Sequence, residues 1–278
     1  MDNSGVTERP LSLVLVGAGK MGSALLGGWF GRGVDASAIT ILDPAPSEGT
    51  QMAARYKGVR INPAVADIAP PAVLFLAIKP QTLDDAAPQI APLVGPQTLV
   101  LSILAGKTTA NLKARLPAAT GIIRAMPNTP AAIRRGITAA YPTPGVNVDQ
   151  RATADELLSA VGRVEWLDDE AHIDAVTAVS GSGPAYVFLL AECLAEAGAA
   201  AGLPPDLAER LARATLEGSG ELMHRSPEKA VSKLREEVTS PGGTTAAALT
   251  ILMGESGLKK LMEAAVEAAK RRAAELSG

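Results

Sequence analysis

The sequence predicts an α/β fold, in which a domain built on a parallel sheet is followed by an all-helical domain. Up to about Asp168, short apolar runs alternate with helix-length segments and are punctuated by Gly and Pro, which is typical of a parallel sheet buried on both faces. From Ala171 onward the segments have the lengths and the Pro-containing boundaries of helices. Because 278 residues can form two cores, we expect a flexible tail at 1–10, an α/β domain at 11–169 and a helical domain at 170–278.

The individual elements follow from the apolar runs and their stop signals. The expected strands are short aliphatic runs, and they cover 11–16, 38–42, 72–78, 98–104, 121–126, 136–141 and 164–167. The expected helices of the second half are separated by Pro-containing turns, and they cover 184–202, 205–223, 226–238, 244–254 and 256–276.

The helix expected at 184–202 is apolar nearly all round, since Glu192 and Glu196 are its only charged residues and lie four apart on one stripe. Such a helix must be buried on most sides. A helical half of about 110 residues can hardly enclose it alone, so we expect at least a homodimer, with a higher assembly of dimers left open. A central helix of a monomeric bundle is the alternative. On either interpretation Cys193 is expected to be a small core residue and not a nucleophile.

The composition excludes several classes of function. Hydrophobic residues make up 47% and charged residues 20%, as in soluble globular proteins, and a net charge of −3 indicates no nucleic-acid or anionic-membrane surface. One cysteine and two histidines suggest neither a disulfide framework nor a metal site. The apolar runs are too short to span a bilayer, and no signal peptide opens the chain. We therefore expect a cytoplasmic protein.

A glycine-rich turn follows the first expected strand and opens a helix. It reads Gly17, Ala18, Gly19, Lys20, Met21, Gly22. In this context the first glycine allows a tight turn, the second lets a pyrophosphate approach the backbone, and the third lets the helix pack on the sheet. The helix N-terminus then favours the diphosphate. We expect a bound dinucleotide, with turn geometry alone as the alternative.

Asp43 ends the second expected strand, 21 residues beyond Gly22. An acidic residue here can accept hydrogen bonds from the adenosine ribose hydroxyls. A turn aspartate is the alternative, because Pro44 follows. No Arg or Lys occurs between Asp43 and Arg55, so a 2′-phosphate would meet like charge without compensation. The local residues therefore favour NADH over NADPH.

A second unusual stretch, Ser-Pro-Gly-Gly-Thr-Thr at 240–245, lies where a helix begins. Two glycines let the backbone come close to a ligand, and backbone N–H groups at a helix N-terminus favour an anion. A plain turn with Thr244 as the N-cap explains the same residues. From the residues alone the two interpretations are equally good.

Five segments occur in a fixed order, namely GAGKMG (17–22), AIKP (77–80), RAMPNTP (124–130), SGSGPAYVF (180–188) and EEVTSPGGTTAAAL (236–249). Together they resemble the pyrroline-5-carboxylate reductases, from residue 11 to the last helix, whereas 1–10 and 69–72 depart from the family's pattern. The resemblance implies a Rossmann-type domain followed by a helical dimerisation domain, with the active site shared between subunits. It also implies NADP(H) or NAD(H) as cofactor and 1-pyrroline-5-carboxylate as the substrate reduced to L-proline.

The resemblance assigns cofactor contacts beyond the glycine loop. Asn62 falls at the adenosine end, and Ala77, Ile78, Lys79, Pro80 and Ala105 border the nicotinamide side. Pro127 and Asn128 are expected to shape the nicotinamide pocket, with a merely rigid loop as the alternative. Lys79 is also expected to supply a positive field near the carboxylate or nicotinamide; a lysine that reaches solvent is the alternative.

The substrate loop is assigned to Ser240, Gly242, Gly243, Thr244 and Thr245. Ser240 and the backbone N–H groups from Gly243 to Thr245 are expected to bind the substrate carboxylate. Thr245 is expected to bond the ring nitrogen through its hydroxyl, whereas a helix threonine that bonds its own backbone is the alternative. Hydride transfer to a protonated imine requires mainly orientation, so two histidines do not argue against an enzyme.

Two other functions stay open at this point. A β-hydroxyacid dehydrogenase would combine a similar glycine loop with a helical domain, but the segment GSGPAYVFLLAECL carries no lysine where that class has a catalytic one. A non-catalytic dinucleotide-sensing protein could use the same fold, and the intact SPGGTT loop argues against it.

Overall fold

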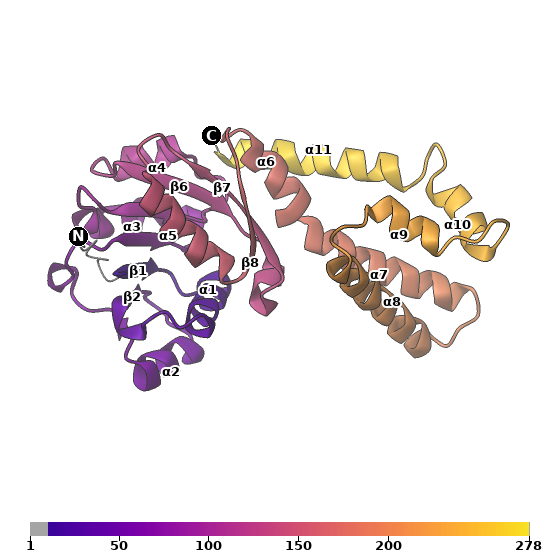
Figure 1. The fold of residues 1–278 in the computed structure, drawn as a ribbon, viewed down its shortest axis with the longest axis horizontal. Helices are drawn as coiled ribbons and strands as arrows, with labels where there is room; N and C mark the ends of the chain where they lie inside the picture. Colours follow the sequence, from indigo (N-terminus) through magenta and orange to yellow (C-terminus); the bar gives the residue numbers. More distant parts are fainter. Residues whose placement is uncertain (1–10, 278) are drawn as a thin grey trace, which may run out of the picture. The chain divides into compact units, whose positions relative to one another are not determined.

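The computed structural model describes residues 11–277, and the tail expected at 1–10 lies outside them. The chain forms two compact units (Figure 1). The first takes the chain up to Gly181 together with its end from Lys270, and the second takes Ser182–Ala269. The expected domain boundary at residue 170 stays a prediction.

The first unit is built on an eight-stranded sheet in the order β3-β2-β1-β4-β5-β6-β7-β8. The strands are β1 (Leu13–Val16), β2 (Ile39–Leu42), β3 (Arg60–Ile61), β4 (Val73–Leu76), β5 (Leu99–Ser102), β6 (Gly121–Met126), β7 (Gly136–Pro142) and β8 (Gly162–Trp166). Neighbouring strands are parallel except β6 and β7, which are antiparallel.

Both faces of this sheet are buried, as expected. Leu13 and Leu15 pack into one core cluster with Trp29 and Phe75, whereas Val14 and Val16 face a second cluster. The covering helices are α1 (Lys20–Gly31), α2 (Glu48–Lys57), α3 (Leu83–Ile90), α4 (Thr109–Arg115), α5 (Val148–Ser159) and α6 (His172–Val176), the last followed by a π-helical turn at Thr177–Gly181. The alternation within β1 is therefore an alternation between two apolar layers.

The seven expected strands are all present. Four are shorter than expected by one or two residues at an end, β6 matches its expected bounds, β7 ends one residue later, and β8 begins two residues earlier and ends one earlier. Two features differ from the prediction. β3 has only two residues and leaves no apolar run to detect. The prediction of a purely parallel sheet is wrong at β6 and β7, which pair antiparallel. Nine residues separate Met126 from Gly136, whereas a parallel crossover needs about a dozen or more.

The second unit is helical, as expected. It contains α7 (Gly183–Ala200), α8 (Pro205–Arg225), α9 (Val231–Glu237), α10 (Thr244–Leu252) and most of α11 (Leu258–Ser277), whose end belongs to the first unit. α9 begins five residues later than predicted, after a turn in which Lys229 N–H donates to the Ser226 carbonyl (3.1 Å). α6 and the π-helical turn were not predicted.

α7 carries the apolar surface that the sequence indicated. None of its residues is buried in the single chain, and Val187, Phe188 and Leu189 are 51%, 64% and 57% exposed. Cys193 is exposed on this helix in the single chain, so the expectation that it is a core residue depends on a partner that covers α7 and stays a prediction. The described residues of the second unit therefore leave an apolar surface of α7 uncovered.

One helical stretch, His172–Ala200, is long and apolar enough to cross a membrane by length and composition alone, and only 6% of its most apolar window is buried. The expectation that no segment could span a bilayer therefore does not hold by this test. A single helix of this kind is weak support for a membrane span, because core helices of soluble proteins pass the same test.

Candidate functional site

The carboxyl ends of β1, β2 and β4 meet where the strand order of the sheet reverses. β1 lies between β2 and β4, so the chain builds one side of the sheet first and then crosses to the other. In open α/β sheets a ligand binds in the crevice at such a switch point. The glycine loop, Asp43 and the Ala77–Pro80 segment all follow these three strands.

The glycine loop has a different geometry at each glycine. Gly17 has φ +90° and its N–H donates to the Leu42 carbonyl (2.8 Å); a Cβ here would lie 2.8 Å from the backbone of Ala77. A Cβ on Gly22 would lie 2.4 Å from the Gly17 carbonyl oxygen. A Cβ on Gly19 would meet nothing within 4 Å. Gly17 and Gly22 are therefore required by the protein's own packing, whereas Gly19 faces open space.

α1 begins at this open space without a side-chain cap. Gly19 is its N-cap and makes no side-chain hydrogen bond, Lys20 is exposed, and Met21 is half-buried. The N–H groups of the first helical turn have no carbonyl partner within the helix. This arrangement fits a diphosphate, whose oxygens accept such N–H groups.

Asp43 lies directly beside the glycine loop. Its Oδ2 accepts the Ala18 N–H (2.6 Å) and its Oδ1 accepts the Ala45 N–H (2.8 Å). Asn62, at φ +48°, bonds the Asp43 backbone twice, through Oδ1 (2.9 Å) and Nδ2 (2.7 Å). The structure thus brings together the two residues expected at the adenosine end. Asp43 also makes the turn bond that the alternative interpretation required.

The residues expected on the nicotinamide side follow β4 and β5, which are neighbours in the sheet. Ala77 N–H donates to the Val16 carbonyl (2.8 Å), which ties the segment to the end of β1. Lys79 is exposed, and its Nζ has no partner among residues 11–277. Ala105 is exposed, next to Gly106, whose φ is +70° and whose Cβ would lie 2.8 Å from the Leu276 carbonyl oxygen.

Pro127 and Asn128 continue from β6. Pro127 is buried, and Asn128 Oδ1 accepts the Ile137 N–H at the start of β7 (2.9 Å). The Asn128 carbonyl also accepts the Ala131 N–H (3.1 Å). The amide oxygen of Asn128 is thus used to hold the loop rigid, as the alternative interpretation proposed. A role at the nicotinamide stays a prediction.

The SPGGTT loop lies in the second unit, between α9 and α10. Gly242 has φ +68°, and Gly243 is the N-cap of α10 without any side-chain cap. The expectation that Gly243 N–H is free is wrong, because it donates to the Ser240 carbonyl (3.0 Å). Thr244 is the first helical residue and not the cap. The N–H groups available to an anion are therefore those of Thr244, Thr245 and Ala246.

Thr245 differs from two other helix threonines of this unit. Thr215 Oγ1 on α8 donates to the Leu211 carbonyl (2.7 Å), and Thr250 Oγ1 on α10 donates to the Ala246 carbonyl (3.1 Å). Thr245 is half-buried, and in the described part of the chain its hydroxyl has no hydrogen-bond partner. The alternative interpretation, a threonine bonded to its own backbone, is therefore wrong for Thr245.

The sequence interpretation missed one group of charged residues. Arg124 on β6 is 4% exposed, and its Nη1 lies 3.1 Å from Glu170 Oε1. Its Nη2 lies 3.5 Å from Asp174 Oδ1. The signal in the sequence was an arginine inside the apolar strand GIIRAM, which implies a buried acidic partner. The sequence does not show which residue pairs with it, because Glu170 is 46 residues away.

Within residues 11–277, no cluster of His, Cys, Asp and Glu could hold a metal ion.

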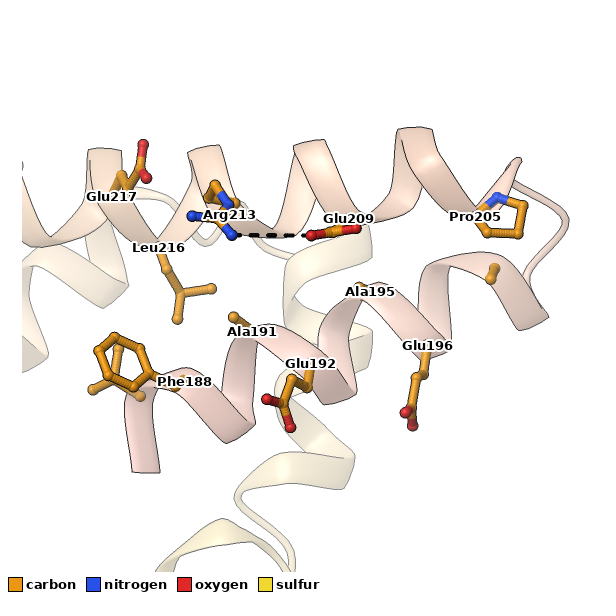
Figure 2. A pocket seen from close by; sticks show the side chains of 12 residues that line it. Phe188, Ala191, Glu192, Ala195, Glu196, Pro205, Glu209, Arg213, Leu216 and Glu217 are labelled. Carbon is orange, nitrogen blue, oxygen red and sulfur yellow. Dashed lines mark ion pairs between the residues drawn. The ribbon is translucent and has the colours of Figure 1, made fainter. Parts of the chain in front are cut away.

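A groove of about 780 Å³ lies between α7 and α8 of the second unit. Its floor is apolar, with Phe188, Ala191 and Leu216 (Figure 2). Glu192 and Glu196 lie on α7, and Glu209 on α8 pairs with Arg213 (3.9 Å). Val187 and Phe188 line this groove and are also among the exposed apolar residues of α7.

Known proteins resemble the chain along nearly its whole length. Residues 170–276 match a family model described as pyrroline-5-carboxylate reductase dimerisation, and 12–106 match one described as NADP oxidoreductase, coenzyme F420-dependent. The chain is 40% identical to a pyrroline-5-carboxylate reductase of Pseudomonas aeruginosa, over 95% of this chain and 96% of the relative. It is 39% identical to that of Synechocystis sp., over 96% and 98%.

Solved structures agree. A pyrroline-5-carboxylate reductase from Coxiella burnetii superposes with a TM-score of 0.89 at 33% identity, over 97% of this chain and 100% of that chain. A pyrroline carboxylate reductase from Plasmodium falciparum with NADP bound superposes with a TM-score of 0.80 at 27% identity, over 96% and 98%.

Proposed function

The chain belongs to the pyrroline-5-carboxylate reductase family, and we propose from this premise that it reduces the imine of 1-pyrroline-5-carboxylate to L-proline with NADH or NADPH. This reaction is the last step of proline biosynthesis. The observation that carries the proposal is Thr245 at the start of α10, whose hydroxyl has no hydrogen-bond partner among residues 11–277. A loop that served only as a turn would have no need of an unpaired, half-buried hydroxyl.

The residues at the start of α10 are proposed to bind the substrate carboxylate and to orient the imine ring. A nicotinamide held here would supply the hydride that reduces the carbon of the protonated imine, whose nitrogen is the amine of the product proline. The N–H groups of Thr244, Thr245 and Ala246 hold the substrate carboxylate at the start of α10. Thr245 Oγ1 accepts the N–H of the iminium and so sets the angle of the ring.

The cofactor residues are proposed as a second set. Gly17–Gly22 hold the diphosphate, and Asp43 with Asn62 border the adenosine ribose. Ala77–Pro80 and Ala105 border the nicotinamide, with Pro127 and Asn128 beside them. Lys79, whose ammonium group is exposed and unpaired among the described residues, is proposed to supply positive charge near the substrate carboxylate.

The wild-type protein is expected to oxidise NADH or NADPH only when 1-pyrroline-5-carboxylate is present, with proline formed in equal amount. The measurement is the loss of cofactor absorbance at 340 nm, together with proline quantification. A folded sample that turns over neither cofactor would remove the enzyme proposal and leave a dinucleotide-binding protein.

Asp43→Asn is expected to raise kcat/KM for NADPH relative to NADH by roughly fivefold, the effect of about 1 kcal/mol of like-charge repulsion at the 2′-phosphate. The wild type is expected to prefer NADH for the same reason. Asparagine retains one acceptor oxygen for the Ala18 or the Ala45 N–H, and the other N–H loses its acceptor. Glu48→Gln is the control, because it removes the same charge from the exposed start of α2. An equal change of the ratio in both variants would mean that Asp43 does not read the ribose.

The protein is expected to sediment as a dimer or a larger assembly at micromolar concentration. We propose that a second copy, and not lipid, covers the apolar side of α7, since the second unit matches a dimerisation model. Phe188→Glu is expected to weaken the assembly, because it places a charge on that surface. Met52→Glu adds the same negative charge at an exposed apolar residue of α2, 51% exposed, and is expected to leave the assembly intact. A monomeric wild type would contradict the proposal.

Two broader assignments are also proposals. Residues 11–169 are proposed as the cofactor domain and 170–278 as the dimerisation and substrate-binding domain; the end of the sheet at Trp166 supports this division. Localisation in the cytoplasm and a higher assembly of dimers rest on the sequence alone.

A further inference from the structure

The charged group around Arg124 is not used by the proposed reaction. Of the residues that the structure describes, Arg124 is the only charged one that is buried. Burying an ion pair contributes little to stability on average, because desolvation offsets the attraction. The ion pair between Arg124 and Glu170 is therefore expected to act mainly through the segments that it holds together, and less through the free energy of folding.

Glu170 makes most of these connections. Its Oε1 accepts from Arg124 Nη1 (3.1 Å) and from the Thr109 N–H (2.8 Å), and its Oε2 accepts from Thr109 Oγ1 (2.6 Å). One carboxylate thus joins β6 to the start of α4. Asp174 faces the same guanidinium, but its Oδ1 is buried without a hydrogen-bond partner in the described chain, although it lies 3.5 Å from Nη2. The distance allows an ion pair, and the geometry does not allow a hydrogen bond.

The two segments that Glu170 joins lead to residues proposed for the nicotinamide side. Thr109 lies four residues after Ala105, in the segment that follows β5. Arg124 lies on β6, three residues before Pro127. The helical stretch that begins just after Glu170 also reaches the end of β6, since a Cβ on Gly181 would lie 2.7 Å from Met126 Cε. The carboxylate of Glu170 is therefore a link between two neighbouring strand ends.

We propose that Glu170 is a positioning residue for hydride transfer, which fixes the ends of β5 and β6 that border the nicotinamide by bonding Thr109 and Arg124 together. The inference rests on the proposed reduction. Misplacement of reacting groups by about 1 Å can cost roughly a hundredfold in rate. The diphosphate and ribose residues follow β1 and β2, which lie on the other side of β4. Loss of Glu170 is therefore expected to affect kcat more than cofactor binding.

The test compares Glu170→Ala with Asp174→Ala in the full-length protein. Each variant removes one carboxylate from Arg124 and leaves the other, so the guanidinium keeps one partner in both. Glu170→Ala is expected to lower kcat by roughly tenfold while the cofactor KM changes by less than about twofold. Asp174→Ala is expected to keep kcat within about twofold. Equal kcat losses, or a raised cofactor KM with unchanged kcat, would overturn the proposal.

A milder pair of variants avoids any change of charge. Thr109→Val removes the hydroxyl that donates to Glu170 Oε2, and Thr109→Ser retains it. The valine variant is expected to lower kcat by roughly threefold and the serine variant to match the wild type. A lower kcat in both, or in neither, would contradict the link.

Amide hydrogen exchange separates this inference from the reaction itself. The Thr109 N–H is expected to exchange faster in Glu170→Ala than in Asp174→Ala, because it loses its acceptor. A wild type without turnover would refute the proposed reduction, whereas unchanged exchange at Thr109 in Glu170→Ala would refute the link.

Discussion

Gly22→Ala is expected to lower the melting temperature by roughly 5–10 °C, whereas Gly19→Ala is expected to leave it unchanged and raise the cofactor KM by roughly a hundredfold. The two changes add the same methyl group at positions three residues apart in the same loop. On Gly22 the new Cβ would lie 2.4 Å from the Gly17 carbonyl oxygen, and neither backbone segment can move without disturbing β1 or α1. On Gly19 the methyl group meets no protein atom within 4 Å and would occupy the space that we propose for the diphosphate.

The measurements are thermal unfolding without cofactor and steady-state kinetics with varied cofactor at saturating substrate. Each hydrogen bond to a charged group contributes about 1.5–3 kcal/mol, so loss of one or two accounts for the expected rise in KM. Gly33→Ala would be a poor control because Gly33 has φ +82°. Gly27→Ala is a better one, since its Cβ would meet nothing within 4 Å and it lies in the middle of α1. If Gly19→Ala binds cofactor as tightly as Gly27→Ala does, the diphosphate does not approach Gly19.

Thr245→Val is expected to lower kcat/KM for 1-pyrroline-5-carboxylate by roughly one to two powers of ten, since a lost hydrogen bond to a charged partner costs about 1.5–3 kcal/mol. Valine keeps the volume and the branching of threonine and removes only the hydroxyl. In the chain that hydroxyl has no partner among the described residues. Its removal is therefore not expected to lower the melting temperature.

Thr250→Val provides the matched control on the same helix. Thr250 Oγ1 donates to the Ala246 carbonyl, so its hydroxyl is already used within α10. We expect kcat/KM of Thr250→Val to stay within about twofold of the wild type. Wild-type kinetics for Thr245→Val, or equal losses in both variants, would show that the hydroxyl of Thr245 does not act on the substrate.

The features that the sequence predicted well are those set by neighbours in the chain. The apolar runs located the strands, and the glycine spacing identified the turn after β1, because both depend on residues within one element and its flanking loop. The Asn62 side chain bonds the Asp43 backbone, so these two residues lie together, and their place at the adenosine end stays a prediction. The antiparallel direction of β7 could also have been predicted from the sequence, because the nine-residue connection from β6 is shorter than a parallel crossover needs.

Other features depend on contacts that no local pattern contains. The partners of Arg124 lie 46 and 50 residues further along the chain, so the sequence shows only that a buried arginine must be paired. The Gly243 N–H was expected to be free because a helix start leaves such groups unpaired, but the turn closes on the Ser240 carbonyl. Cys193 was expected in a core because its neighbours are apolar, but the described residues of the second unit leave it exposed on α7.

The return of the chain at Lys270 to the first unit has a consequence for biosynthesis. Residues 270–277 belong to the same compact unit as the sheet, and the Leu276 carbonyl lies against Gly106. The ribosome makes the whole of Ser182–Ala269 before it reaches them. The first unit therefore cannot complete its folding while Ser182–Ala269 is still being translated. Until residues 270–277 are made, Gly106 lacks its contact with Leu276.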